Sequence, residues 1–485
     1  MFYFDSSGFL KLTSPLPSFL SYTMFWVSVG KIDCIPDYTN NSPLIPSVVS
    51  FLPRDTIVDR KLNALFSTDP YVVVGEAAKL RIDMHAHSTF YHAKRFLGRS
   101  YQSDAVQSLI HEVEFKVEPA SISSEDVPRS NDPHGEGILF HVPTGYLQRD
   151  LQQKKEKVKV KPTSISTLKH YISPERIGSY VVRHLLHLTG FYLGYHNIHS
   201  AIIAVPAKFD ATQRQATVRA FQMAGLKVVR MLEEPAAAAL AYGLQHKSGV
   251  DYILVYDFGG GTLDVSILHV SEGYVEVIAS EGDDTLGGAD FDSAVAHVMM
   301  NKLDVSENLS RISSALERIV ATADPSFDTE ELLASICEPA AVTPLCQISS
   351  LHTIGEKLKI ALSDKPIASA QCLGLSESGL QELEEKGYTL ENFCTALTPI
   401  HMTLTLEEFH QAASALFERA LVPIYSVLRK LDLKPDDIDE VVLVGGTTRM
   451  PLIRDLVKRA LNVQSLNSHI DPDITVAYGA ASVID

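Results

Sequence analysis

The sequence predicts an α/β protein built from two lobes that share one architecture. From residue 171 to residue 245, apolar runs typical of strands alternate with periodic stretches typical of helices, which is the pattern of α/β domains. A near-repeat indicates duplication, because residues 234–243 and 471–479 each lead from an acidic residue and a proline to Ala-Tyr-Gly. Two such helices, one in each half, are expected when the halves of a fold are related.

The expected elements follow the chain in order. Short strands at 48–51 and 71–74 precede a helix at 88–97. Alternation then predicts, in sequence, helix 174–195, strand 201–205, helix 211–223, strand 228–232 and helix 235–242. A β-hairpin of strands 252–256 and 262–270 carries a glycine run at its turn, and strand 440–444 and a helix from Pro451 come last. Residues 304–350 are predicted to be helical and loop-rich, and residues 373–389 irregular.

The length of 485 residues exceeds a single compact core, since domains typically hold roughly 100–200 residues. We expect lobe I over residues 1–247, lobe II over residues 248–471, and a closing helix over residues 472–485 that returns to lobe I. Insertions are predicted at residues 119–165, 304–350 and 372–390.

Composition argues against several classes of function. Lys and Arg number 42 and Asp and Glu number 59, and the formal charge of −17 disfavours binding to nucleic acid or to an anionic membrane. Five cysteines without a CxxC spacing indicate neither a disulfide framework nor a cysteine-based zinc site. Residues 12–30 are uncharged but contain Pro15 and Pro17, so we expect a tail leading into a strand at 24–29 and no membrane span.

The residues best suited to chemistry lie at the predicted hairpin turn. Asp257 and Asp264 flank three consecutive glycines, which can present backbone N–H groups to phosphate oxygens where a Cβ would collide. The two carboxylates suit Mg²⁺ held through water, or the orientation of an attacking water, because a hard cation prefers carboxylate oxygens. The alternative is a tight glycine-rich hairpin without a ligand. A Walker loop is excluded, since it joins a strand to a helix.

Two further glycine pairs and one helix face are candidates for binding a nucleoside. The pair at 445–446 follows a buried-looking strand and precedes a helix, and the pair at 287–288 lies in a turn. Three polar residues of a predicted helix fall on one face that can hydrogen-bond a ribose and a base, with a solvated face as the alternative. These three residues are Glu356, Lys359 and Ser363.

Specific motifs carry a resemblance to a known family. They are Ala93-Lys94-Arg95-Phe96-Leu97-Gly98-Arg99, Val205-Pro206-Ala207, Gln213-Arg214-Gln215-Ala216-Thr217, and Glu234-Pro235 with the alanines that follow. With the hairpin glycines, these motifs make the chain similar to the ATPase domain of the seventy-kilodalton heat-shock family, the DnaK-type chaperones, from about Gly30 to the C-terminus. The resemblance implies the duplicated, ribonuclease H-like fold shared with actin and sugar kinases, with ATP in a cleft between two lobes.

The resemblance also assigns roles to residues. Lys94 resembles the catalytic lysine that contacts the γ-phosphate and the attacking water, and Thr262 the hydroxyl that meets this phosphate. Glu234 and Asp257 resemble the acidic residues around Mg²⁺ and the water, so ATP or ADP with Mg²⁺ are the implied ligands. Further phosphate, ribose and base positions are Gly259, Gly260, Gly261, Asp264, Gly287, Gly288, Glu356, Lys359, Ser363, Gly445, Gly446, Thr448, Arg449 and Asp473.

The family also implies an allosteric relay and partners. Pro206 and Arg214 resemble the proline switch and its arginine relay, which pass the nucleotide state toward the interdomain linker. A nucleotide exchange factor is an expected partner and a monomer the expected state. The chain stops at Asp485 without that linker or a peptide-binding β-sandwich, which weakens the case for a J-domain partner. In this it resembles the truncated, microsomal-type members, although no secretory signal is legible; the cytoplasm and the endoplasmic reticulum lumen both stay open.

Two departures from the family bear on activity. The family opens with a strand carrying Asp-Leu-Gly-Thr-Thr, which grips Mg²⁺ waters and phosphates, whereas counting back from Gly30 puts Leu16 at the position of that Asp, between two prolines. The first phosphate loop is therefore missing; a mistaken start or splice in the deduced gene is the alternative account of this stretch. Ile360 replaces an arginine that stacks on adenine, which exchanges a cation–π contact for apolar packing.

Three functions follow from these observations. The first is an ATPase in which Mg²⁺ and Lys94 neutralise charge during attack of water on the γ-phosphate. The second is a nucleotide-dependent interaction protein, a pseudo-ATPase that binds nucleotide without turnover because the first loop is lost. The third is a sugar kinase on the same fold, which the match of Lys94 and the proline-switch segment to the chaperone branch disfavours.

Overall fold

The computed structural model describes residues 8–13, 21–28, 31–37, 40–52, 71–82, 85–111, 113–120, 137–143, 171–194, 198–302, 310–312, 314–315, 318–319, 343–346 and 348–483. The chain divides into two compact units. The first unit comprises Met1–Asp283, Pro423–Thr448 and Lys458–Asp485, and the second comprises Asp284–Val422 and Arg449–Val457. The predicted lobe boundaries at 247 and 471 stay predictions. Leu16 and most of the predicted insertions at 119–165 and 304–350 lie outside the described residues.

The main sheet of the first unit has the order β12-β11-β1-β2-β3. Its strands are β1 (Gly8–Thr13), β2 (Ser21–Ser28), β3 (Lys31–Ile35), β11 (Ile198–Val205) and β12 (Lys227–Glu233), and β4 (Ile45–Pro46) pairs with β2. The tail expected before residue 24 is a wrong prediction, because β1 lies inside this sheet, parallel to β11 and antiparallel to β2. β1 ends at Thr13, and Pro15 and Pro17 lie outside the described residues.

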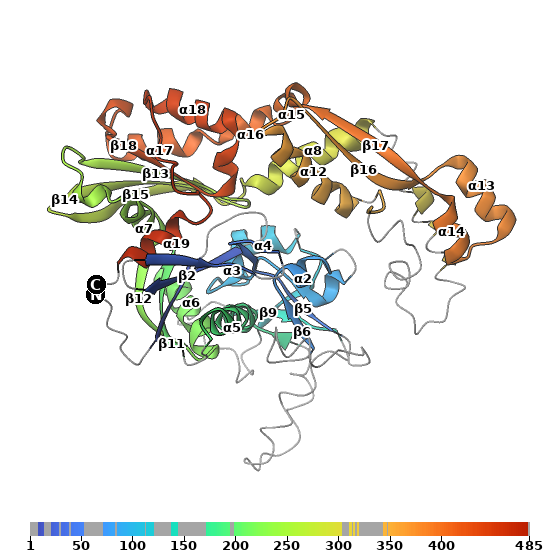
Figure 1. The fold of residues 1–485 in the computed structure, drawn as a ribbon, viewed down its shortest axis with the longest axis horizontal. Helices are drawn as coiled ribbons and strands as arrows, with labels where there is room; N and C mark the ends of the chain where they lie inside the picture. Colours follow the sequence, from blue (N-terminus) through green and yellow to red (C-terminus); the bar gives the residue numbers. More distant parts are fainter. Residues whose placement is uncertain are drawn as a thin grey trace, which may run out of the picture. The chain divides into compact units, whose positions relative to one another are not determined.

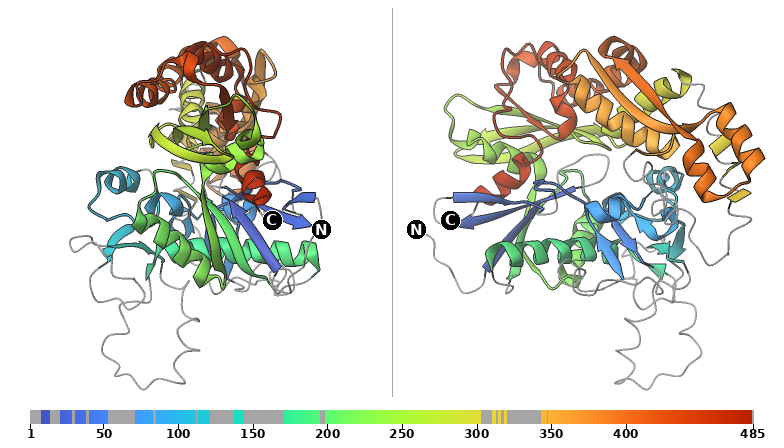
Figure 2. Two further views of the ribbon diagram at one scale, coloured as in Figure 1. Left: turned by 90° about the vertical axis from the view of Figure 1, so that its left-hand side faces the viewer. Right: turned by 45° about the vertical axis from the view of Figure 1, so that its right-hand side comes forward.

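Helices cover this sheet as the alternating pattern predicted. α5 (Pro174–Leu193) and α6 (Ala211–Met223) pack side by side (Figure 2). Sequence signals explain their starts: the Ser173 side chain caps α5, with proline at its first turn, and Asp210 forms a capping box with Gln213 at α6.

Two small sheets complete this half of the first unit. One contains β5 (Val49–Phe51), β6 (Val72–Val74) and β7 (Thr89–Phe90); the other contains β8 (Val117–Ala120), β9 (Gly137–His141) and β10 (Tyr171–Ile172). The short helices are α2 (Glu76–Lys79), η1 (Ala86–Ser88), α3 (Ala93–Phe96) and α4 (Asp104–Ile110). The helix predicted over 88–97 is thus reduced to α3, because Thr89 and Phe90 pair with β5 and His92 has a φ of 57°.

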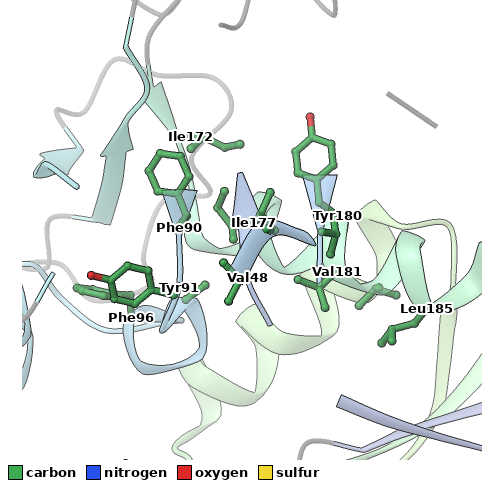
Figure 3. Close-up of a cluster of buried hydrophobic side chains, with 14 of the residues drawn as sticks. Val48, Phe90, Tyr91, Phe96, Ile172, Ile177, Tyr180, Val181 and Leu185 are labelled. Atoms are coloured by element: carbon green, nitrogen blue, oxygen red, sulfur yellow. The ribbon is translucent and has the colours of Figure 1, made fainter. Parts of the chain in front are cut away.

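Aromatic packing builds the core beneath these sheets. Phe90 stacks on Phe140 with ring centroids 5.7 Å apart, and Phe51 meets Tyr180 of α5 edge to face. Figure 3 shows part of this buried cluster, in which strand and loop residues such as Val48 and Phe90 lie beside Ile177, Tyr180 and Val181 of α5. The core therefore fixes the segment that leads into α3.

The second sheet of the first unit has the order β15-β14-β13-β18. Its strands are β13 (Tyr252–Phe258), β14 (Leu263–Ser271), β15 (Tyr274–Asp283) and β18 (Glu440–Val444). The accompanying helices are α7 (Glu234–Ala241), η4 (Leu244–His246), η5 (Pro435–Asp437), η6 (Gly446–Arg449) and α19 (Thr475–Ser482). α17 (Val422–Lys430), α18 (Pro451–Leu461) and η6 each contain a unit boundary. The predicted hairpin is confirmed, with β13 paired to β14 from Tyr252 to Phe258.

The two helices of the near-repeat, α7 and α19, pack against each other. The Tyr242 hydroxyl donates to the Ile470 carbonyl at 3.3 Å, and the Tyr242 ring meets His469 edge to face. Figure 1 shows α19, in red, beside the blue strands β1 and β2, which it contacts. The repeated helices thus form a shared layer within the first unit.

The second unit pairs two helices with a long two-stranded sheet. Its elements are α8 (Gly288–Lys302), α12 (Ile348–Leu362), β16 (Ile367–Leu375), α13 (Glu377–Lys386), α14 (Leu390–Ala396), β17 (Leu397–Thr405), α15 (Leu406–Ala412) and α16 (Ser414–Arg419). The irregular stretch predicted at 373–389 is wrong, because β16 extends through Leu375 and the Ser376 side chain caps α13. Among the described helices, none combines the length and apolarity needed to cross a membrane.

The cysteines depart from the expectation of no disulfide framework. Cys346 and Cys372 form a disulfide, and Cys394 is also disulfide-bonded. Cys372 lies in the middle of β16, and the Cys346 backbone N–H donates to Leu373 O at 2.8 Å, so the bond fixes an incoming segment to this strand. Sequence spacing gave no sign of this pairing, since the bonded residues meet through the tertiary fold.

Candidate functional site

The β13–β14 hairpin places two carboxylates opposite each other in the first unit. Asp257 pairs with Asp264 across the hairpin, and the Gly259 N–H donates to Thr262 O at 3.0 Å to close the turn. β13 is an interior strand, paired on its other side with β18. Asp257 is therefore buried, at 7% exposure, and its Oδ1 has no hydrogen-bond partner among the described residues.

Lys94 and Glu234 bring a buried ion pair to the same site. Lys94 lies in α3 and Glu234 begins α7, so the carboxylate lies at the positive end of a helix. The Lys94 Nζ is 2.9 Å from Glu234 Oε1, and the two side chains are 12% and 6% exposed. The ammonium also lies over the Phe209 ring, 5.9 Å from its centroid.

Electrostatics in this group favour the arrival of positive charge. Burial first, and then the charges of Glu234 and Asp264, raise the pKa of Asp257 well above its usual range, and Lys94 offsets this only in part. Burial also raises the pKa of Glu234, against the opposing effect of Lys94. Buried carboxylates that repel one another lower their energy by binding protons or a cation.

A pocket opens onto these carboxylates within the first unit. Its lining includes Pro206, Glu234, Asp257 and Asp264. Lys208, in the loop after β11, contacts the last of these, with its Nζ 2.9 Å from Asp264 Oδ1. Sequence reasoning missed Lys208, because its contact is made by a loop distant in sequence from Asp264.

A second glycine loop is locked to the hairpin turn. Gly445 has a φ of 84°, and a Cβ there would lie 2.4 Å from Phe258 O, so no other residue fits. The Thr447 hydroxyl donates to Gly259 O at 2.8 Å, which ties the two glycine loops together. Thr447 was not among the predicted site residues. Thr448, predicted to contact the nucleoside, is fully buried and donates its hydroxyl to Gly445 O.

Asp473 lies beside this second loop. Its Oδ1 would be 2.9 Å from a Cβ added to Gly446, and the residue is 8% exposed. Asp473 also contributes to the raised pKa of Asp257. The structure thus brings the predicted residues of the hairpin turn together with Gly445, Gly446, Thr448 and Asp473 in one region of the first unit.

The predicted allosteric pair shares one hydrogen-bonded loop. The Arg214 guanidinium donates to Ala207 O at 3.2 Å and to Phe209 O at 2.8 Å, and it pairs with Glu233 Oε1 at 2.8 Å. Arg214 therefore connects the loop that begins at Pro206 to the residue directly before Glu234.

The remaining predicted residues lie in the second unit and are described within it. Lys359 of α12 is buried, and its Nζ pairs with Asp292 Oδ1 at 2.8 Å and donates to Gly288 O at 3.0 Å. The solvated-face alternative is therefore wrong for this lysine, whereas Ile360 beside it is 59% exposed. The other predicted residues of this unit are Gly287, Glu356, Ser363 and Arg449, of which Arg449 is exposed.

Comparison with known proteins shows the family of the chain. The family profile described as "Hsp70 protein" matches residues 63–131, 144–326 and 350–484. The chain belongs to the Hsp70 family. It therefore has the actin-like ATPase fold of that family, and most of the residues discussed above fall within the matched ranges. The stretch that holds β1 and β2 lies before the first of these ranges.

A curated relative shows the same family. The chain is 34% identical, over 432 residues, to "Chaperone protein DnaK" of Prochlorococcus marinus (strain MIT 9515). The alignment covers 86% of this chain and 53% of the relative, so the chain spans about half the length of the curated protein it matches.

The residues of the site fit a divalent cation. Asp257 Oδ1 is a buried hydrogen-bond acceptor that has no donor among the described residues. Burial, and then the charges of Glu234 and Asp264, raise the Asp257 pKa. Among the described residues, no three His, Cys, Asp or Glu side chains are grouped to hold a metal directly. Coordination through water stays the prediction for Asp257 and Glu234.

Proposed function

We propose that this Hsp70-family chain binds Mg²⁺–ATP at the β13–β14 turn and hydrolyses it to ADP and phosphate. The observation that carries the proposal is the meeting of the Lys94–Glu234 ion pair and the unpartnered Asp257 oxygen beside a glycine turn. Members of this family are ATPases, which supports the proposal. Asp257 and Glu234 would hold Mg²⁺ through water, and the ion, when bound, neutralises part of the phosphate charge.

The chain's own residues have distinct tasks in this reaction. The ion pair with Glu234 fixes the Lys94 ammonium, whose positive charge can stabilise a phosphate oxygen. Asp257 Oδ1 is an acceptor that can orient a water for in-line attack on the γ-phosphorus. A bond forms from the water oxygen to phosphorus as the bond from phosphorus to the bridging oxygen breaks. ADP leaves with that bridging oxygen, and the proton of the attacking water passes to the released phosphate.

A second candidate is a nucleotide-dependent switch that binds without turnover. It is favoured by the β1–β2 connection, residues 14–20, which reads Ser-Pro-Leu-Pro-Ser-Phe-Leu and contains no carboxylate and no threonine. Loss of an oriented phosphate donor can cost about 2.7–4 kcal/mol of barrier, by analogy with oxyanion-hole donors. Binding would then persist while hydrolysis became slow.

A role in protein folding is proposed on the ground of family membership. Hsp70 proteins work with co-chaperones, and a nucleotide exchange factor is the partner we propose for this chain.

Single-turnover hydrolysis of Mg²⁺–ATP, measured together with binding, tests the proposal. Asp257→Asn should keep nucleotide binding but slow hydrolysis by about 10²–10³-fold, the usual effect of removing one oriented group. Asp251→Asn is the matched control, since Asp251 is an exposed carboxylate on the same segment. Binding without hydrolysis by the wild type would favour the switch, and absence of binding would reject both functions.

A further inference from the structure

Lys208 is a charged residue that contacts the pocket-lining Asp264, and the reaction above gives it no role. It lies in the loop between β11 and α6, and its Nζ is 2.9 Å from Asp264 Oδ1. The two side chains are 33% and 24% exposed, so the pair lies at the rim of the pocket. A second ammonium, in addition to Lys94, therefore pairs with a carboxylate of the group formed by Glu234, Asp257 and Asp264.

The position of this ammonium is built into the sheet. In the β14–β15 register Asp264 lies opposite Gly282, and a Cβ on Gly282 would lie 2.3 Å from Lys208 Nζ and 2.9 Å from Asp264 Oδ1. The ammonium thus occupies space that any side chain at residue 282 would fill. An ordinary surface ion pair has no such space reserved for it by the backbone.

The loop that carries Lys208 is also fixed on both sides. Arg214 binds the carbonyl before it, Ala207 O, and the carbonyl after it, Phe209 O. The Phe209 N–H donates to Pro206 O at 3.1 Å. These bonds hold the backbone of Lys208, so little backbone freedom is lost when its side chain reaches Asp264.

We propose that Lys208 is a resident counter-ion of Asp264, which competes with a divalent cation in the nucleotide-free site and supplies positive charge to a nucleotide polyphosphate. The inference rests on the proposed nucleotide binding. The Lys208 ammonium neutralises Asp264, one of the carboxylates that raise the Asp257 pKa, so it reduces the attraction of the group for a cation before nucleotide arrives. An ammonium has three donors and Asp264 takes one, which leaves donors for phosphate oxygens. Lys208 therefore lets the site bind nucleotide without a divalent ion.

Two measurements on Lys208→Met test this with opposite expected signs. Mn²⁺ binding to the nucleotide-free protein, followed by the electron paramagnetic resonance of free Mn²⁺, should tighten by about tenfold, because a unit charge near the carboxylate is removed. ADP binding in EDTA, followed by calorimetry, should weaken by about tenfold for the same reason. With saturating Mg²⁺ the ADP affinity should change by less than about threefold, since the bound ion supplies the charge.

Matched variants separate charge from structure. Lys208→Arg keeps the charge and should behave like the wild type in both measurements. Lys247→Met removes a lysine that pairs with Glu440, at the opposite end of β18 from Gly445, and should change neither. Lys208→Gln is a second neutral variant, and thermal unfolding confirms that each protein is folded.

The outcomes decide between the two proposals. Weakening of both Mn²⁺ and ADP binding by Lys208→Met would show a merely structural role for Lys208. No change in either affinity would show that the Lys208–Asp264 pair does not affect binding. Either result overturns the inference and leaves the proposed nucleotide binding intact. Failure of the wild type to bind ADP even with Mg²⁺ would overturn the proposed function and this inference together.

Discussion

Replacing Lys94 by methionine tests whether the buried ion pair offsets the free-energy cost of burying the Glu234 carboxylate. Lys94 Nζ lies 2.9 Å from Glu234 Oε1, and the side chains are 12% and 6% exposed. Methionine retains much of the lysine volume but leaves the Glu234 charge unpaired. Breaking a buried pair from one side costs about 3–5 kcal/mol. We expect the free energy of unfolding to fall by about 3 kcal/mol near pH 8. This value is at the low end of that range, because Glu234 can take up a proton.

The loss should depend on pH with a defined sign. Burial raises the pKa of Glu234 and Lys94 opposes that rise, so the pKa is higher still in the variant. When the folded-state pKa exceeds the unfolded value, the penalty is full above the folded pKa and disappears below the unfolded one. The difference in unfolding free energy between wild type and variant therefore shrinks as the pH falls from 8 toward 5.

Urea denaturation followed by circular dichroism across this pH range measures the effect. The double variant Lys94→Met with Glu234→Gln should recover much of the loss, because it removes both charges together. Lys247→Met, which removes an exposed ion pair with Glu440, should cost less than about 1 kcal/mol at any pH. A loss that is equal at pH 5 and pH 8, or a double variant as unstable as the single one, would refute the reasoning.

Three further predictions follow from particular contacts. Asp257→Asn should stabilise the fold near pH 8 by about 1–2 kcal/mol, the usual size of a stabilising change. The gain should fade at lower pH, because a raised folded-state pKa penalises the ionised carboxyl only at high pH. Thermal unfolding at several pH values measures the gain, and a gain that does not change with pH would contradict this prediction. Gly445→Ala should cost about 2–4 kcal/mol and abolish nucleotide binding, because its Cβ would lie 2.4 Å from Phe258 O at a φ of 84°; an alanine variant with wild-type affinity in calorimetry would contradict this. Reduction of the Cys346–Cys372 bond should lower stability by about 3 kcal/mol, as for loops of similar length; unchanged thermal unfolding of the Cys346→Ser, Cys372→Ser variant would argue against it.

The sequence was sufficient wherever an element carries its own signals. Helix Ala211–Met223 and strand Glu440–Val444 have the predicted bounds. The helix starts at an Asp210 capping box, and the strand is an apolar run that ends at a glycine pair. Such signals lie within a few residues of the element they define.

Prediction failed where distant partners decide the conformation. Thr89 and Phe90 fit a helical pattern, yet they pair with Ser50 and Val49 as a strand. The sequence of Gly8–Thr13 does not by itself indicate a strand. The segment forms a strand because it pairs with β11 on one side and β2 on the other. Propensity is a weak guide when tertiary pairing supplies the larger stabilisation.

The candidate site divides in the same way. Lys94, Glu234 and Asp257 come from three separate segments, and motif resemblance named all three before their proximity was visible. Lys208 and Thr447 have no such motif, and they act through contacts to Asp264 and to Gly259 O, respectively, that only the fold creates. A glycine opposite Asp264 in the β14–β15 register was the available clue, but the register itself had to be known.

The central claim is that nucleotide binds at the β13–β14 turn, and hydrogen–deuterium exchange with and without Mg²⁺–ATP tests it most directly. The claim predicts slower exchange of the amides of residues 259–262 and 445–448, because the two glycine loops are tied together by Thr447. Peptides from the α13–α14 region, residues 376–396, should serve as an unaffected reference. Protection confined to other segments, or no protection at saturating Mg²⁺–ATP, would contradict the claim.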